Sequence, residues 1–528
     1  MDNTVDAKTV KSWISDDDEI AFIDVREIGQ HAEGHPFFSI SIPFSTFEIN
    51  IERLLPNKNV RVVLFDDNNG ISELAYKQAK ALGYSKILIL KEGVKGWLGA
   101  KFKLFDGINV PSKSFGELVE HKFRTPSITP KELLQKQNKK EDIIILDGRP
   151  FEEYNKMSIP ESICCPNAEI PYKISSIIKS PKTDIIINCA GRTRSIIGAQ
   201  TLINFGIKNK VYALENGTQG WVLSDLKLEN NKTNFLDITP KDKEKEKLKS
   251  EISNLLDKNH IKVIDLPKVQ DLIKDETRST YIFNVKTNLS PEKSVPGIRN
   301  VPGGQLVQAT DNYVGVLKSR IILFDEGDLV RAGTTALWLK KMNFECYVFK
   351  GIETEINTLN IKNYIKFKNI SVTHISLNDI KASDTSIIFD IRKSIDYCKS
   401  RLKNSIWLNR SALKQNTSNL IKNIIIVFDD IHKVSLLVKD LKEIYPEIQI
   451  KVYHWNKEEI FKYPECLDQN IIELDKKFID FNFHTYMRHK GNKDHARQYL
   501  KWEIDLLDKM DKQEINFFKI GNINAESC

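Results

Sequence analysis

Residues 185–195 read Ile-Ile-Ile-Asn-Cys-Ala-Gly-Arg-Thr-Arg-Ser, and this stretch decides the fold. It opens with a short, unbroken run of isoleucines, which is typical of a strand buried on both faces of a parallel sheet. Directly afterwards, Ile196, Ala199 and Ile203 recur at helical spacing and predict an amphipathic helix. The stretch is therefore interpreted as strand, loop and helix, with Cys189 where the strand ends.

The same unit occurs four times along the chain. Each copy has an apolar run that ends in an acid or its amide and, 39 to 42 residues later, a second run that ends in a polar residue. Repeats of this kind with alternating strands and helices favour tandem α/β domains, each with three layers and a central, mostly parallel sheet. The paired end markers are Asp24 and Asp66, Asp147 and Cys189, Asn284 and Asp325, and Asp390 and Asp429.

The repeats also set the predicted domain boundaries. A Lys/Glu run at 241–247 separates the second and third copies and predicts a solvated linker or helix. In the tail, Asn492 is placed to cap a helix whose apolar stripe predicts docking on the other domains. The predicted segments are domains at 5–105, 126–232, 258–352 and 370–458 and a helical tail at 459–528, whose stripe comprises Ala496, Leu500, Ile504 and Leu507.

Composition argues against several classes of function. The 528 residues carry a net charge of +7 without a basic stripe interleaved with aromatic residues, so nucleic-acid binding is not expected. We find no secretory signal and no run approaching the ~18 apolar residues of a membrane span. The seven cysteines are scattered, without the spacing of a disulfide framework. We therefore expect a reduced, cytoplasmic protein with no nucleic-acid or membrane partner.

The loop from Cys189 to Ser195 is the candidate site. Between the end of a strand and the start of a helix, its backbone amides are expected to form a cradle for an anion. Gly191 allows unusual backbone dihedrals, and Arg192 and Arg194 add positive charge. A thiol in this field is expected to react as the thiolate. The predicted substrate-binding residues are Ala190, Gly191, Arg192, Thr193, Arg194, Ser195 and Arg149.

Histidine is missing from residues 126–232, so a Cys–His pair is excluded within this domain. The predicted chemistry is therefore performed on an anionic sulfur or oxygen donor without a general base. In the tail, His484, His489 and His495 lack the tight spacing of metal ligands. We expect neither a metal nor a cofactor.

Three further residues of the second copy have two interpretations each. Arg149 either binds the anionic donor or forms an ion pair with Asp147 or Glu152, and the ion pair is favoured. Cys164 or Cys165 is either a resolving thiol that accepts sulfur from Cys189 or a buried, inert thiol, and the inert role is favoured because it is commoner.

The second copy resembles the rhodanese family. The resemblance lies in Leu146-Asp147-Gly-Arg149-Pro-Phe-Glu-Glu-Tyr154, Ile159-Pro160, the Cys189–Arg194 loop and Glu215-Asn-Gly-Thr-Gln-Gly220-Trp221. The whole chain is similar to bacterial rhodanese-like sulfurtransferases with four tandem modules. This resemblance implies a persulfide on Cys189, a small anionic sulfur donor such as thiosulfate, and a thiophilic acceptor such as cyanide, a thiol or a protein thiol.

Loop length separates this prediction from a Cys-x5-Arg phosphatase, because the sixth position after Cys189 is Ser195 and not arginine. The other three copies have Asp66, Asp325 and Asp429 at the cysteine position, each followed by a second acid. A carboxylate cannot form a persulfide, so these copies are predicted to be catalytically inactive. They are interpreted as scaffold, with partner docking, shaping of the entrance to the second copy, or cation binding as alternatives.

The sequence thus predicts a thiosulfate-type sulfurtransferase acting in two steps through a Cys189 persulfide. The alternative function is a multi-module sulfur carrier or redox-regulatory binding protein with little steady-state turnover, which three inactive copies out of four motivate. Thiosulfate, 3-mercaptopyruvate and a glutathione or protein persulfide all remain open as the donor.

Overall fold

The computed structural model describes residues 3–521 except 288–296, 360, 362–369, 382–385, 414–422 and 484–491. Four five-stranded sheets follow one another along the chain, and each has the strand order of the first sheet, β1-β5-β4-β2-β3. Every described pairing within these four sheets is parallel. The prediction of tandem three-layer α/β units is therefore confirmed.

The apolar runs found in the sequence are the central strands of these sheets. In the first two units the strands are β1 Thr4–Val5, β2 Ile20–Asp24, β3 Ile40–Ser41, β4 Arg61–Phe65, β5 Ile87–Leu90, β6 Ser127–Ile128, β7 Ile143–Asp147, β8 Ile163–Cys164, β9 Asp184–Asn188 and β10 Val211–Leu214. In the third and fourth they are β11 Lys262–Ile264, β12 Thr280–Asn284, β13 Ile298–Asn300, β14 Arg320–Phe324, β15 Glu345–Phe349, β16 Thr373–His374, β17 Ile387–Asp390, β19 Ser405–Trp407, β20 Asn423–Phe428 and β21 Gln449–His454. A separate antiparallel pair joins β18 Arg401–Leu402 to β22 Leu467–Asp468.

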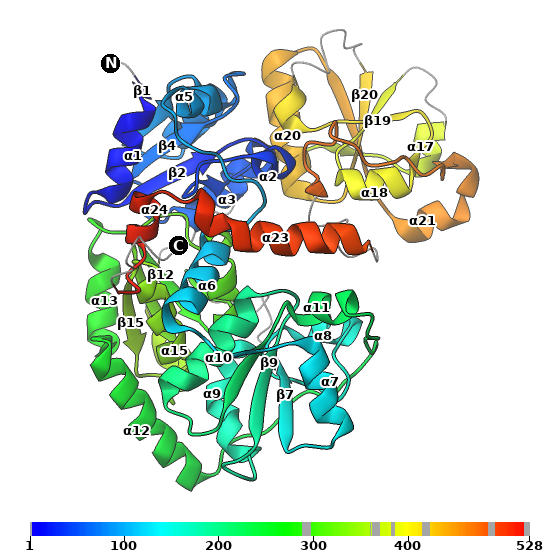
Figure 1. Ribbon diagram of the computed structural model, residues 1–528. Coiled ribbons are helices and arrows are strands. Elements are labelled where there is room, and N and C mark those ends of the chain that lie inside the picture. The colour runs from blue at the N-terminus through cyan, green and yellow to red at the C-terminus, as the bar shows by residue number, and fades with distance from the viewer. Residues whose placement is uncertain are drawn as a thin grey trace.

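Helices cover both faces of the sheets (Figure 1). Those of the first half are α1 Ala7–Ser15, α2 Ile28–Glu33, α3 Phe47–Leu54, α4 Ile71–Ala81, α5 Gly93–Gly99, α6 Val110–Phe123, α7 Pro130–Asn138, α8 Phe151–Lys156, α9 Ile170–Lys173, α10 Thr193–Phe205, α11 Gly217–Leu223 and α12 Asp242–Lys258. Those of the second half are α13 Leu266–Lys274, α14 Gly303–Gln308, α15 Val330–Lys341, α16 Glu353–Ile356, α17 Leu377–Lys381, α18 Ser394–Lys399, α20 Ile431–Ile444, α21 Lys457–Lys462, α23 Lys493–Lys509 and α24 Lys512–Phe517.

The Lys/Glu run forms the first half of α12, which confirms the helical alternative for this segment. In α10, Ile196 and Ala199 are buried as predicted, but Ile203 is 36% exposed. The prediction for Ile203 was wrong because α10 packs against α6, α9 and α12 as well as its own sheet, which shifts the buried face to Leu202 and Phe205. Amphipathic periodicity detects one buried face, whereas this helix is covered on several.

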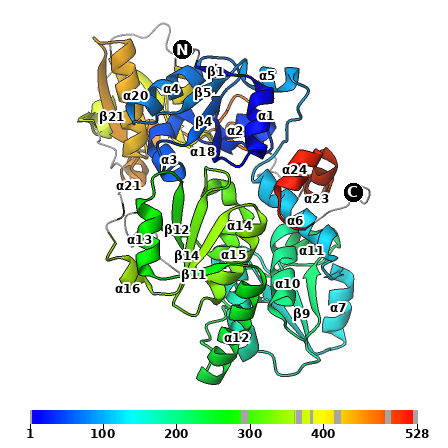
Figure 2. The ribbon, with the colours of Figure 1, turned by 90° about the vertical axis from the view of Figure 1, so that its left-hand side faces the viewer.

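The C-terminal helices lie across the middle of the molecule, between the first and fourth units on one side and the second and third on the other (Figures 1 and 2). Asn492 caps α23 as predicted, because its side chain accepts hydrogen bonds from the amides of Asp494 and His495 at 3.1 and 3.2 Å. Ala496 and Leu500 are buried, but Ile504 is 49% exposed, and Leu506 takes its place. The tail is thus docked, as expected, but the buried face of α23 includes Leu506 instead of Ile504.

Buried ion pairs join the units. Arg331 of the third unit binds Glu169 of the second, with Nε to Oε1 at 2.7 Å. Arg410 of the fourth binds Glu48 of the first at 2.6 Å. Pairs buried in this way are costly to break singly, because the partner left behind is an uncompensated charge. The described helices include none long and apolar enough to cross a membrane.

Candidate active site

Cys189 follows β9 directly, and α10 begins at Thr193, so the loop between them comprises only residues 190–192. The predicted loop runs to Ser195, whereas its last three residues, 193–195, form the first turn of α10. The Cys189 side chain is 2% exposed, and its Sγ lies 3.5 Å from the hydroxyl of Ser195. The first amides of a helix have no partner within the helix, so α10 begins with N–H groups available to an anion.

A neighbouring turn holds this loop in place. The amide of Thr218, at the start of α11, donates to the Cys189 carbonyl at 2.8 Å, and the amide of Gln219 donates to the Ala190 carbonyl at 3.2 Å. Gly217 has a φ of +52°, and a Cβ there would lie 2.2 Å from the Cys189 carbonyl oxygen. Only glycine fits this position. Gly191 itself is not left-handed, and it is instead confined by Glu503, whose Oε2 would lie 3.1 Å from an added Cβ.

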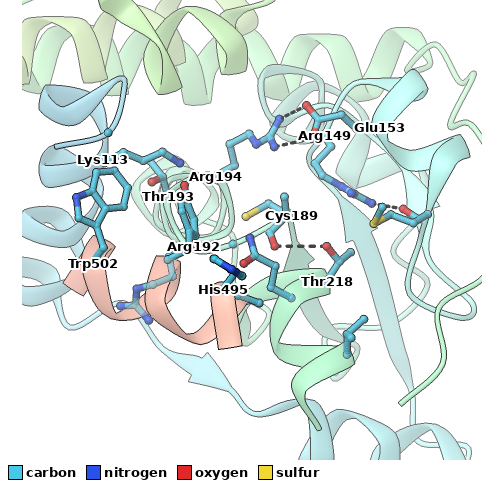
Figure 3. Close-up of a pocket in the computed structure, with 18 of the residues that line it drawn as sticks. Lys113, Arg149, Glu153, Cys189, Arg192, Thr193, Arg194, Thr218, His495 and Trp502 are labelled. Atoms are coloured by element: carbon cyan, nitrogen blue, oxygen red, sulfur yellow. Dashed lines mark hydrogen bonds and ion pairs between the residues drawn. The ribbon is translucent and has the colours of Figure 1, made fainter. Parts of the chain in front are cut away.

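The two loop arginines are both paired with carboxylates. Arg192 binds Glu117 of α6, with Nη2 to Oε2 at 2.8 Å, and also Glu120. Arg194 binds Glu153 of α8 at 2.7 Å (Figure 3). Burial opposes ionisation of Arg194, but the Glu153 charge outweighs it and raises the pKa of Arg194. The sequence showed two positive charges at the loop and gave no sign of the carboxylates that offset them.

Arg149 forms the ion pair that we favoured. Its guanidinium group binds Asp147 at 2.7 Å and also the Met157 carbonyl, and the side chain is 2% exposed. Asn188 donates to the same carboxylate, with Nδ2 2.8 Å from Asp147 Oδ2. Asp147 therefore links the ends of β7 and β9 beside the cysteine, and Arg149 neutralises it. Arg149 also lines the cavity, and its predicted contact with the donor stays a prediction.

Cys164 and Cys165 are both buried, with 0% and 1% exposure. Burial, with a smaller effect from Asp147, raises the pKa of Cys164 to about 12. Burial likewise raises the pKa of Cys165. Because the thiolate is the reactive form of cysteine, these values favour the inert role over that of a resolving thiol.

Cys189 faces a cavity of about 680 Å³ (Figure 3). One wall is the cysteine loop with the start of α11, and the other is formed by residues 106–113 and by α23 of the tail. His495 comes from α23, more than 300 residues away in the chain, so the cavity contains an imidazole although the second unit has none. No sequence signal pointed to this arrangement. The lining residues that sequence reasoning missed include Lys113, Gln219, His495, Tyr499 and Trp502.

At the corresponding strand ends, the aspartates of two units occupy their own cradles. Asp66 accepts hydrogen bonds from the amides of Asn68 and Ser72 at 2.8 and 2.9 Å. Asp429 of the fourth unit differs, since it is exposed and Asp430 caps α20 instead. The described residues include no cluster of three or more His, Cys, Asp or Glu that could hold a metal ion. The second of the two aspartates is Asp325 of the third unit, which accepts hydrogen bonds from the backbone amides of Gly327, Leu329 and Ala332 at 3.0 to 3.1 Å.

Comparison with known proteins agrees with the repeated fold. Residues 6–100 and 129–224 match the rhodanese-like domain. The crystal structure of thiosulfate sulfurtransferase from Pseudomonas aeruginosa is 29% identical, covers 98% of this chain and 99% of its own, and superposes with a TM-score of 0.87. The BH2092 protein from Bacillus halodurans is 24% identical over 21% of this chain and 80% of its own, with a TM-score of 0.19. No curated protein matches. The first two units are thus similar to the rhodanese-like domain, and the third and fourth units repeat their strand order.

Proposed function

We propose that this protein is a sulfurtransferase that carries sulfane sulfur as a persulfide on Cys189. The observation that supports it best is the place of this cysteine, at a strand end and before the first amides of α10, facing a cavity of about 680 Å³. The 29% identical protein from Pseudomonas aeruginosa is described as a thiosulfate sulfurtransferase, which favours the same class of reaction here.

In the first step, the Cys189 thiolate attacks the outer sulfur of thiosulfate. A bond forms between Sγ and this sulfur, the S–S bond of thiosulfate breaks, and sulfite leaves with the electron pair. In the second step, the acceptor attacks the outer sulfur of the persulfide and Cys189 leaves as the thiolate. The amides of residues 190–195 stabilise the negative charge on the transferred sulfur, and Arg194, Arg192 and Arg149 attract the anionic donor to the cavity.

The other three units are proposed to be inactive. Their limits follow the sequence repeats at 5–105, 258–352 and 370–458, and the active unit spans 126–232. Asp66 and Asp325 have no sulfur to transfer, and each already supplies a carboxylate to the amides around it. Thiosulfate is the donor we favour, with cyanide or a thiol as acceptor.

The test is thiosulfate-dependent thiocyanate formation together with intact-protein mass spectrometry. Thiosulfate is expected to add about 32 Da, one sulfur atom, to the protein. Cys189→Ser is expected to abolish both the added mass and the turnover, while Asp66→Ala retains both. Turnover by the serine variant contradicts the proposal. Loading of one sulfur per chain without steady-state turnover favours the alternative, a sulfur carrier.

A further inference from the structure

The cavity at Cys189 is much larger than the proposed donor requires. Thiosulfate has five heavy atoms, whereas about 680 Å³ lies within the ~300–1,000 Å³ typical of pockets for drug-sized ligands. The α23 helix contributes Asn492, His495, Tyr499 and Trp502 to the lining. Figure 3 shows His495 and Trp502 on this helix beside the cysteine loop.

The α23 helix is fixed at this place. Trp502 donates from Nε1 to the Asp106 carbonyl at 3.1 Å and packs against Gly107, where a Cβ would lie 2.4 Å from the indole ring. At the other end of the helix, Lys493 forms an ion pair with Asp225, which follows α11 of the second unit. The wall is thus built into the folded chain, and its side chains hold defined positions relative to Cys189.

Gln219 is the second observation that points to a ligand. Its side chain lines the cavity and is only 8% exposed, yet neither its nitrogen nor its oxygen has a hydrogen-bond partner among the described residues. A buried amide without partners costs roughly 1–3 kcal/mol per unsatisfied group. Its backbone amide binds the Ala190 carbonyl, so the side chain stands next to the cysteine loop. A group that offers both a donor and an acceptor satisfies it, as a peptide amide does.

We propose that this cavity, between the start of α11 and α23, binds the sulfur acceptor, and that the acceptor is an organic thiol carrying a peptide amide. Gln219 on the α11 wall binds the amide, and His495 on the α23 wall takes the proton of the thiol. This inference rests on the proposed function. The thiol proton moves to the imidazole, and the thiolate attacks the outer sulfur of the Cys189 persulfide. The S–S bond to Sγ breaks, Cys189 leaves as the thiolate, and the acceptor leaves as its persulfide, with no net oxidation.

The binding role is tested by comparing two acceptors, N-acetylcysteine amide and 2-mercaptoethanol, with thiosulfate as donor. The unaltered protein is expected to prefer the amide-bearing thiol by about tenfold in kcat/KM, and Gln219→Leu is expected to remove most of this preference by raising KM. Gln135→Leu, the same change at an exposed glutamine of α7, is the matched control and should keep the preference. An equal preference in the Gln219 variant overturns the inference.

The role of His495 is tested with acceptors of different acidity. His495→Gln is expected to lower kcat/KM for N-acetylcysteine amide by at least about tenfold, because a general base typically contributes 10²–10⁴-fold. With thionitrobenzoate, which is already ionised at neutral pH, the loss should be less than about twofold. Equal losses with both thiols overturn the assignment, and so does no loss with either. If thiosulfate and cyanide give no turnover in the unaltered protein, the proposed function itself fails.

Discussion

Cys189 in the second unit and Asp66 in the first follow equivalent strands, and the backbone around them is nearly the same. Gly217 and Gly93 both have a left-handed φ, +52° and +53°, and an added Cβ would lie 2.2 and 2.1 Å from the carbonyl oxygens of Cys189 and Asp66. In both units the next amide donates to that carbonyl, at 2.8 and 2.9 Å. The two units thus share this scaffold down to single hydrogen bonds.

The difference lies in the side chain and the loop that follows it. Asp66 and Asp325 each direct a carboxylate at amides of the loop and of the next helix, so the negative charge comes from the protein itself. In the second unit the loop is one residue shorter, and a cysteine replaces the aspartate. The comparison indicates that, in the first and third units, the amides after this strand bind a carboxylate of the protein itself. A substrate anion can bind these amides only in a unit where the protein does not already supply a carboxylate.

The largest effect is expected when the active loop is converted to the inactive type. Cys189→Asp should lower thiocyanate formation on the order of 10³-fold or more, because a carboxylate forms no persulfide. The thermal unfolding midpoint should not fall below that of Cys189→Ser, since the carboxylate can accept the loop amides. A midpoint well below that of the serine variant would contradict the comparison, because it would mean that the amides after position 189 do not accept a carboxylate as those after Asp66 do.

Removing the carboxylate from the third unit is expected to affect stability and not turnover. Asp325→Ala leaves three amides without their acceptor and should lower the free energy of unfolding by about 2 kcal/mol, measured by chemical denaturation. Turnover at Cys189 should stay within about twofold of the unaltered protein. Asp429→Ala is the matched control, because that carboxylate is exposed and should cost less than about 0.5 kcal/mol. Equal costs at both positions contradict the role given to Asp325.

The third unit should also make stability depend on pH. Burial, followed by the nearby Asp325 charge, raises the pKa of Asp328 to about 6. Because this folded value lies above the unfolded one, the folded state binds the proton more tightly, and that contribution to stability is lost as pH rises through about 6. Raising the pH from about 5 to about 8 should therefore lower the free energy of unfolding of Asp328→Asn by about 1 kcal/mol less than that of the unaltered protein. An unchanged pH dependence would show that Asp328 does not titrate in this range.

The smallest effect concerns the carboxylate that offsets Arg194. Glu153→Gln removes its negative charge from the edge of the cavity and should lower KM for thiosulfate by about threefold with little change in kcat. Glu152→Gln is the matched control, because the Glu152 carboxylate next to Glu153 is exposed and has no ion pair among the described residues. A KM that rises in the Glu153 variant means that Glu153 positions Arg194 more than it opposes the donor.

The fold could be predicted from the sequence because its signals are local and repeated. A buried parallel strand requires an unbroken apolar run, and the sequence contains such runs at regular intervals. The place of Cys189 followed in the same way from the end of one run. Predictions for Ile203 and Ile504 failed because helical periodicity does not reveal which neighbour covers a helix. The ion pair of Arg149 with Asp147 was predictable, since the two are only two residues apart.

The sequence by itself determined the four α/β units, the cysteine that follows β9 and the acids at the same position in the other units, since each depends on residues close together in the chain. Only the tertiary structure decided what surrounds that cysteine. Glu117 and Glu153 reach the loop arginines from other helices, and His495 arrives on a helix that docks from the far end of the chain. The physical reason is that electrostatics and cavity shape depend on distance in space, and residues separated by hundreds of positions become neighbours only when the domains pack.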